Sequence, residues 1–153
     1  MIKCRGLHTL ETSILATYDQ EVQAYNIITG IMSDSCRPYE VVPDHIMMWV
    51  NEEGFLGEVE CLQPVLVTAP PCRMREEAVR REGFPQLEIL ARNRFYMVQH
   101  SEDGFVIWID EERVIDTVVV YKTLQFLLSE QEVVGIAAQQ AMPEQEAATQ
   151  GLL

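Results

Sequence analysis

The stretch PDHIMMWVNEEGFLGEVECLQP, residues 43–64, decides the fold class. Its first arm is apolar at both alternating sets of positions, which is typical of a strand covered on two faces. The NEEG segment predicts a short hairpin turn in which Gly54 supplies a positive φ angle. The returning arm alternates apolar residues with Glu58 and Glu60. The stretch therefore predicts a central β-hairpin in which the middle of one face is exposed to solvent.

The composition is that of a globular protein. The chain has 153 residues, enough for one domain or for two small modules that share a core. Hydrophobic residues make up 48% and charged residues 23%, and no apolar run approaches the roughly 20 residues of a membrane span. The N-terminal segment lacks the apolar run of a secretory signal, so the expected compartment is the cytoplasm.

Neither the cysteine spacing nor any sequence motif predicts a bound metal or cofactor. The four cysteines lack the spacing of a zinc site, and we interpret them as buried thiols in a reducing compartment rather than as a disulfide framework. The sequence contains no phosphate-binding or dinucleotide-binding glycine motif, so neither a metal nor a cofactor is expected. These cysteines are Cys4, Cys36, Cys61 and Cys72.

Net charge is the strongest compositional feature. Eleven basic and 24 acidic residues give a formal net charge of −13. Such a chain repels phosphate backbones, which disfavours nucleic-acid binding. It attracts a basic protein, and charge steering speeds such an association. The alternative is that the acidity only maintains solubility.

The rest of the chain predicts further hairpins and one helix. Residues 12–29 and the segment around the turn at 101–104 each predict a hairpin, and so does the last apolar stretch before residue 138. Residues 114–122 are ambiguous between strand and helix, with a β-branched content that favours strand. CRMREEAVRREG, residues 72–83, predicts a short helix because prolines precede it and Glu and Arg recur at i, i+4 spacing.

These elements predict an α+β fold of antiparallel hairpins with one short Arg-rich helix. The predicted organisation is a β-rich half at 1–66, a helical connector at 67–93, a second β-rich half at 94–137 and a disordered tail at 138–153.

The two halves resemble each other. IMMWVNEEGFLGEV aligns with LQFLLSEQEVVGIA so that Gly57 falls on Gly135 and Val50 on Leu128. An internal repeat predicts two similar halves packed sheet on sheet or joined in one sheet. The alternative is that any two amphipathic hairpins look alike.

A resemblance to a known family covers residues 16–64. YDQEVQAYNI and the hairpin stretch that follows resemble the YuzE-like family of small bacterial domains. The resemblance implies an α+β fold and carries no activity. The residues that match the family pattern are Tyr18, Asp19, Ala24, Tyr25, Glu40, Val41, Gly54, Leu56, Gly57 and Glu60.

Catalytic chemistry has one candidate pair. Glu58 and Glu60 are two residues apart on a predicted strand, which places their carboxylates on one face about 7 Å apart, a separation that glycosidases use. Catalysis also needs one carboxyl group in a desolvated cleft, so a solvated sheet face is the favoured interpretation. The three histidines lie in no nucleophile motif, and the two tryptophans are expected in the core.

The favoured hypothesis is a non-enzymatic acidic module that binds a basic protein, in the manner of bacterial immunity proteins or antitoxins. A second hypothesis is a structural module that forms homodimers through edge strands, and a third is a small hydrolase that uses the two strand glutamates. The residues predicted to contact a basic partner are Glu52, Glu53, Glu58, Glu60, Asp103, Asp110, Glu111 and Glu112.

Overall fold

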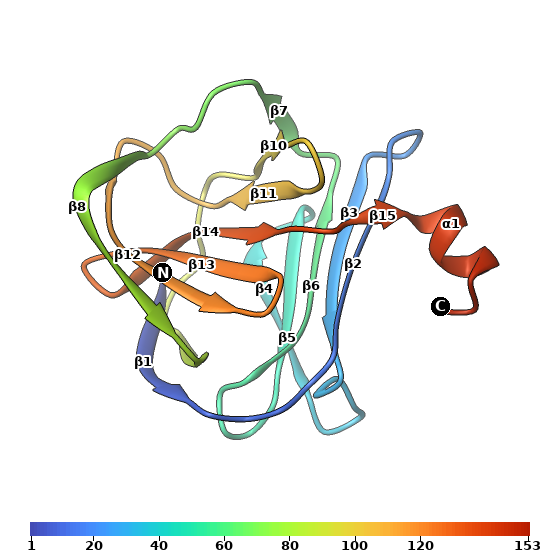
Figure 1. Cartoon of the computed structure of the whole chain (residues 1–153), viewed down its shortest axis with the longest axis horizontal. Coiled ribbons are helices and arrows are strands. Elements are labelled where there is room, and N and C mark those ends of the chain that lie inside the picture. The colour runs from blue at the N-terminus through green and yellow to red at the C-terminus, as the bar shows by residue number, and fades with distance from the viewer.

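The computed structural model describes residues 1–153 and is nearly all β-sheet. Strands hold 57% of the residues and the single short helix 4%. Two sheets pack face to face, and their strands cross steeply, as in orthogonal β-sandwiches (Figure 1). The predicted α+β class is therefore wrong, because the chain has a mostly-β fold.

The six-stranded sheet, here sheet B, has the order β15-β2-β3-β6-β5-β4. All neighbours are antiparallel except β15 and β2. The hairpin quoted first forms β5 and β6, and Gly54 in its turn has a φ of 92°. The strands are β2 (Ile14–Asp19), β3 (Ala24–Thr29), β4 (Arg37–Val42), β5 (Ile46–Val50), β6 (Leu56–Leu62) and β15 (Met142–Pro143).

The nine-stranded sheet, here sheet A, has the main order β7-β10-β11-β14-β13-β12-β8. Strand β1 joins it by pairing with both β14 and β9. The strands are β1 (Ile2–His8), β7 (Val65–Val67), β8 (Arg73–Glu82), β9 (Phe84–Ile89), β10 (Met97–His100), β11 (Phe105–Trp108), β12 (Val114–Tyr121), β13 (Leu124–Ser129) and β14 (Glu132–Ala138).

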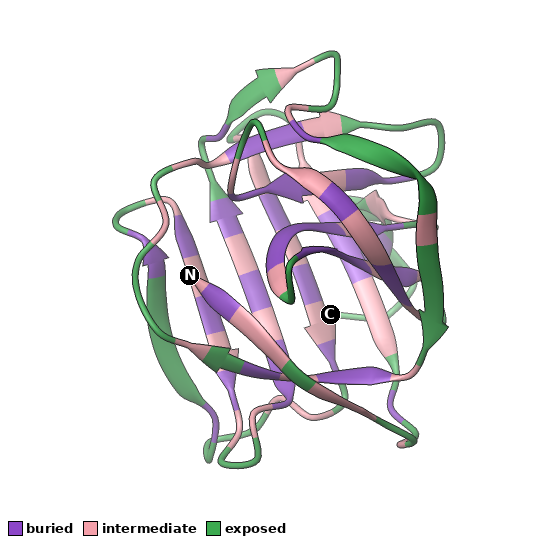
Figure 2. Cartoon of the chain, turned by 90° about the vertical axis from the view of Figure 1, so that its left-hand side faces the viewer, coloured by how far each residue is buried: buried purple, intermediate pink, exposed green.

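The predicted Arg-rich helix is instead the edge strand β8. It runs parallel to β12 and is exposed along nearly its whole length (Figure 2). Helical charge pairs contribute only about 0.2–0.5 kcal/mol each, so pairing with β12 overrides them. Gly83 has a φ of 144° and forms the corner between β8 and β9.

The predicted disordered tail contains ordered elements. Its residues include β15 and the helix α1 (Glu144–Thr149), which lies against β2 and buries Ala147. No helix of the chain is of the length and apolarity that crossing a membrane requires.

The two sheets repeat one strand order. The order β2-β3-β6-β5-β4 in sheet B corresponds to β10-β11-β14-β13-β12 in sheet A, with antiparallel neighbours throughout. The strand that follows each five-stranded repeat pairs with the other repeat: β7 runs parallel to β10 in sheet A, and β15 runs parallel to β2 in sheet B. The two halves are thus related by an approximate twofold axis, which supports the internal repeat.

A shared β-bulge fixes the alignment of the repeats. The register of β5 on β6 shifts between Trp49 and Val50, and that of β13 on β14 shifts between Leu127 and Leu128. Val50 therefore corresponds to Leu128, as predicted. The turn after Val50 is one residue longer than its counterpart, so Glu58 rather than Gly57 corresponds to Gly135.

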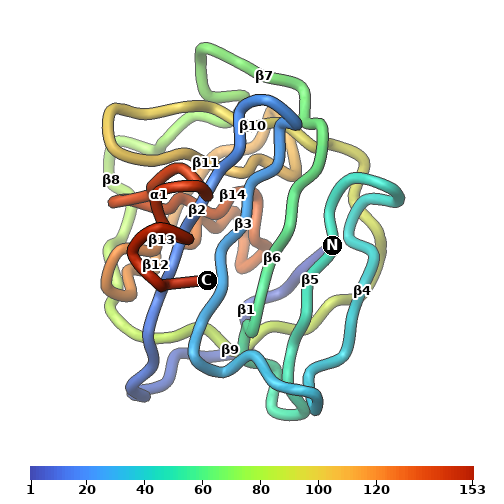
Figure 3. Tube along the Cα trace, turned by 90° about the vertical axis from the view of Figure 1, so that its right-hand side faces the viewer, coloured from blue at the N-terminus to red at the C-terminus, as the bar shows by residue number.

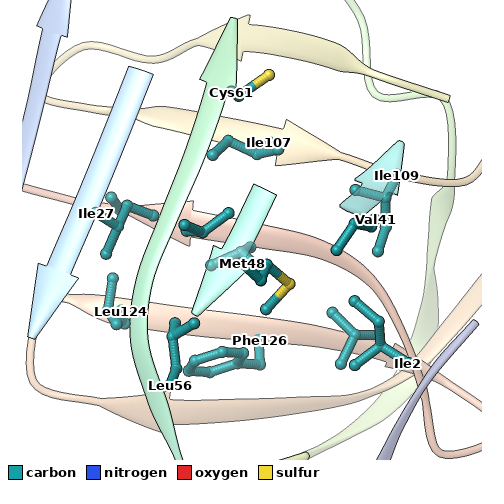
Figure 4. Packing of buried hydrophobic residues seen from close by; sticks show 14 of the residues in the cluster. Ile2, Ile27, Val41, Met48, Leu56, Cys61, Ile107, Ile109, Leu124 and Phe126 are labelled. Carbon is teal, nitrogen blue, oxygen red and sulfur yellow. The ribbon is translucent and has the colours of Figure 1, made fainter. Parts of the chain in front are cut away.

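The core lies between the sheets and draws equally on both repeats (Figure 4). The equivalent residues Tyr25 and Phe105 meet in it, with ring centroids 5.2 Å apart. Each such fully buried aromatic side chain contributes about 1.5–3 kcal/mol. The labelled aliphatic residues Ile27 and Ile107, also equivalent, point into the same layer.

Substitution of Gly104 tests the packing of the hairpin β10–β11 against β14. A Cβ atom at Gly104 would overlap the carbonyl oxygen of Ala138, so Gly104→Ala should destabilise the fold by about 2–4 kcal/mol and lower Tm by about 5–10 °C in thermal unfolding followed by circular dichroism. Gly6→Ala is the matched control, because its Cβ would meet only the His8 ring at 3.7 Å. Equal Tm values for the two variants would contradict this packing.

Candidate functional site

The outer face of sheet B is the most distinctive surface of the molecule. It is turned toward the viewer in Figure 3, where α1 covers only its β2 side. Its side chains come from the three central strands and are all half-buried. We call this surface the open face, and its residues are Asn26, Ile28, Met47, Trp49, Glu58 and Glu60.

Strand register arranges the open face in two rows. Trp49 of β5 and Ile28 of β3 flank Glu58 of β6. In the next row, Met47 and Asn26 flank Glu60 in the same way. Each carboxylate therefore lies between side chains of two neighbouring strands, and apolar groups line both rows.

The two carboxylates of the open face have different surroundings. Glu58 accepts a hydrogen bond from Nδ2 of Asn26 at 2.6 Å. Partial burial and the charge of Glu58 raise the pKa of Glu60 above its ordinary value. None of the six ion pairs of the chain includes either glutamate. The open face thus holds two negative charges that no cation of the chain neutralises.

A shallow cavity of about 170 Å³ borders the open face at Glu60. His45 forms one side, with its ring stacked on Tyr96 at 3.7 Å and its Nδ1 2.9 Å from the carbonyl oxygen of Leu62. Two further carboxylates line the cavity, those of Glu40 and Asp44, and Glu40 pairs with Arg92 at 3.2 Å. At this edge of the sheet, Asp44 is therefore the added carboxylate without an ion pair.

The other predicted contact residues do not join this surface. Glu52 and Glu53 lie in the β5–β6 turn, and Asp103 lies in the β10–β11 turn, next to the opposite end of β6. Asp110 is paired with Arg113 at 2.8 Å. Glu111 and Glu112 follow it in an exposed loop. Of the eight predicted residues, only Glu58 and Glu60 share one site.

The sequence analysis missed the neutral half of the open face. Trp49 was expected in the core, yet it is only half-buried. The hairpin register carries the missed signal, because a residue of β5 opposite a glutamate of β6 points to the same side of the sheet. Trp49 and Met47 both satisfy that condition.

The equivalent face of sheet A is buried around Trp108, whereas Val106, Gln125 and Ala137 beside it are half-buried. Trp108 is only 3% exposed there and lies in a buried cluster with Leu127 and Val134. Cys72, just before β8, belongs to this cluster, and Val67, the last residue of β7, packs against it. The inner faces of both repeats thus form the shared core, whereas their outer faces differ in burial.

The remaining polar and thiol groups have structural surroundings. His100 Nε2 lies 2.6 Å from the hydroxyl of Tyr25, between the two sheets. Burial raises the pKa of the Cys61 thiol to about 12, which opposes thiolate chemistry. No group of three or more His, Cys, Asp or Glu residues is placed to hold a metal ion.

Comparisons with known proteins add no relative. A scan against protein-family models finds no match to the chain, and a search of curated proteins finds no similar sequence. The resemblance of residues 16–64 to the YuzE-like family remains a prediction.

Neutralising Glu60 should stabilise the protein at neutral and alkaline pH. A raised pKa means that the folded state binds the proton more tightly than the unfolded state, so this group lowers stability as pH rises through its titration. Glu60→Gln should therefore raise Tm by about 1–2 °C at pH 8 and leave it unchanged at pH 4, measured by differential scanning calorimetry.

Glu53→Gln is the control for this measurement, because Glu53 lies in the exposed β5–β6 turn. It should give the same Tm difference at both pH values. A lower Tm for Glu60→Gln at pH 8 would show that the carboxylate of Glu60 stabilises the fold, contrary to this account.

Proposed function

We propose that the chain is a non-enzymatic module that binds a basic partner protein through the open face. The observation that carries the proposal is the position of Glu58 and Glu60, which are half-buried among apolar side chains and lack a cation from their own chain. An incoming Lys or Arg would supply the missing charge and form charge-assisted hydrogen bonds.

The apolar residues of the open face suit a long cationic side chain. The aliphatic stem of a Lys or Arg can pack on Met47 and Ile28 while its charged end reaches a carboxylate. A guanidinium group can also stack on the indole of Trp49, an interaction that contributes about 0.5–2 kcal/mol. The open face therefore offers both an apolar contact surface and negative charge to a Lys or Arg side chain.

The charge distribution favours approach from this side. The chain carries a net charge of −13, which attracts a basic partner over a distance and raises its association rate. Strand β8, which carries four arginines, lies on the opposite side of the molecule from sheet B (Figure 1). A basic protein thus meets the acidic face without crossing the arginine-bearing strand.

The surroundings of the two glutamates support binding rather than hydrolysis. Glu58 is engaged by Asn26, and the cavity beside Glu60 has a volume of about 170 Å³. Substrate pockets usually measure about 300–1,000 Å³. Among basic partners, cationic nuclease toxins are the proposed class, which would make the chain an immunity protein or antitoxin.

Self-association is a second candidate, favoured by strand β7. Val65 and Leu66 are 53% and 50% exposed on this strand, at an outer edge of sheet A. An exposed apolar edge strand can pair with the same strand of a second copy. The pairing would be apolar, so added salt would not weaken it.

Removal of the two charges tests the proposed function. The variant Glu58→Gln/Glu60→Gln should bind nona-arginine at least about tenfold more weakly than the unchanged chain in isothermal titration calorimetry at low ionic strength. Binding by the unchanged chain should also weaken as salt is added.

Glu52→Gln/Glu53→Gln removes the same net charge from an exposed turn and is the matched control. It should change the affinity less than about twofold. Equal losses in the two double variants would mean that the peptide responds only to net charge, and the open face would then not be the binding surface.

A further inference from the structure

Strand β8 forms a long free edge of sheet A. It pairs with β12 alone, and no strand follows it in the order of the sheet. It has ten residues, of which nine are exposed and only Ala78 is half-buried. Proteins usually keep edge strands short, because their unpaired backbone groups invite another strand. The free edge of β8 is therefore a candidate interface with a second molecule.

A bulge in β8 interrupts its pairing with β12. Met74 lies opposite Ile115. Val79, five residues further along β8, lies opposite Thr117, which is only two residues beyond Ile115. Residues 75–78 accordingly have no Cα partner on β12. Because Ile115 and Thr117 point to one side of the sheet, their partners do so too, and residues on the two sides of the bulge share a face at odd spacing.

The charges of β8 have no partner within the chain. The strand carries four arginines and three glutamates, and none of the six ion pairs of the chain involves them. Charges of a single sign on an edge strand would repel a second copy, whereas β8 carries both signs. Met74 and Val79 are 51% and 50% exposed and add apolar surface to the same strand. A partner for this edge must therefore offer charges of both signs.

The order of these charges is self-complementary. When two β8 strands run antiparallel about a point between Ala78 and Val79, each facing pair from residue 75 to residue 82 joins an arginine to a glutamate or two apolar residues. Twofold symmetry forms each pair twice. The members of each charged pair are separated by an odd number of positions across the bulge, as a shared face requires. The facing pairs are Arg75 with Glu82, Glu76 with Arg81, Glu77 with Arg80 and Ala78 with Val79.

Other arrangements of two β8 strands lack this match. A shift of the register by one residue sets Arg75 opposite Arg81 in one direction and Glu76 opposite Glu82 in the other. Two parallel strands in register would set each charge opposite its own copy. Like charges directly opposite one another destabilise a strand pair. The order of the charges therefore selects one antiparallel register.

We propose that two copies of the chain associate through their β8 strands, antiparallel and centred between Ala78 and Val79. The contact combines an apolar centre with ion pairs on both sides of it. Strand β8 lies on the opposite side of the molecule from sheet B (Figure 1), so both open faces stay accessible in the dimer. The proposal is independent of what the open face binds.

Charge reversal on β8 tests the proposed dimer. The unchanged chain should sediment as a dimer at low ionic strength in analytical ultracentrifugation, and its dissociation constant should rise as salt is added. In Arg80→Glu/Arg81→Glu the new glutamates face Glu76 and Glu77, so the dissociation constant should rise at least about tenfold. Glu76→Arg/Glu77→Arg should weaken the dimer in the same way, because arginines then face arginines.

Restored pairing is the matched control. An equimolar mixture of the two double variants should form heterodimers, because every charge of one strand then faces the opposite charge on the other. The variant that combines all four changes keeps the net charge of −13 and should dimerise as the unchanged chain does. Recovery in these samples would also show that the double variants remain folded.

Three outcomes would overturn the proposal. One is an unchanged chain that is monomeric at low ionic strength. Another is a dimer that both charge reversals leave intact. The third is a dimer that persists in added salt and is lost in Val65→Asp/Leu66→Asp, which would assign the contact to strand β7 instead.

Discussion

The apolar contact between the inner faces of the two sheets is the interaction on which the other features depend. Equivalent residues of the two repeats meet there, as the rings of Tyr25 and Phe105 do. Strands β7 and β15 reinforce the contact, because each leaves its own repeat and pairs with the first strand of the other. Because this layer occupies both inner faces, the outer faces and the sheet edges are left for interactions with other molecules.

The outer faces of the two repeats differ in charge, and this difference explains why they differ in burial. Sheet A has a glycine and an alanine in the middle of its outer face, and Val67 and Cys72 pack against the buried cluster around Trp108 there. Sheet B has Glu58 and Glu60 at the same positions and has no such cover. Burying two carboxylates under an apolar segment would cost several kcal/mol, whereas a cationic segment would compensate their charge.

The sequence predicted local β-structure well and long-range arrangement poorly. The β5–β6 hairpin followed from alternation and from Gly54, and the repeat followed from shared hairpin patterns. The segment now seen as β8 was predicted as a helix because its Glu and Arg spacing suits both structures; only pairing with β12 decides between them. Glu58 and Glu60 were found by strand alternation, while Trp49 was missed because burial of an outer face depends on whether a segment distant in sequence packs on it, which the strand itself does not encode.

The central claim is that one outer face is acidic and open around Trp49 while its counterpart is buried around Trp108, and tryptophan fluorescence tests it directly. In the variant Trp108→Phe the remaining Trp49 should be quenched more strongly by caesium than by iodide, because the carboxylates beside it attract cations and repel anions. In Trp49→Phe the remaining Trp108 should resist both ions. Stronger quenching of Trp49 by iodide than by caesium, or a Trp108 as accessible as Trp49, would contradict the account.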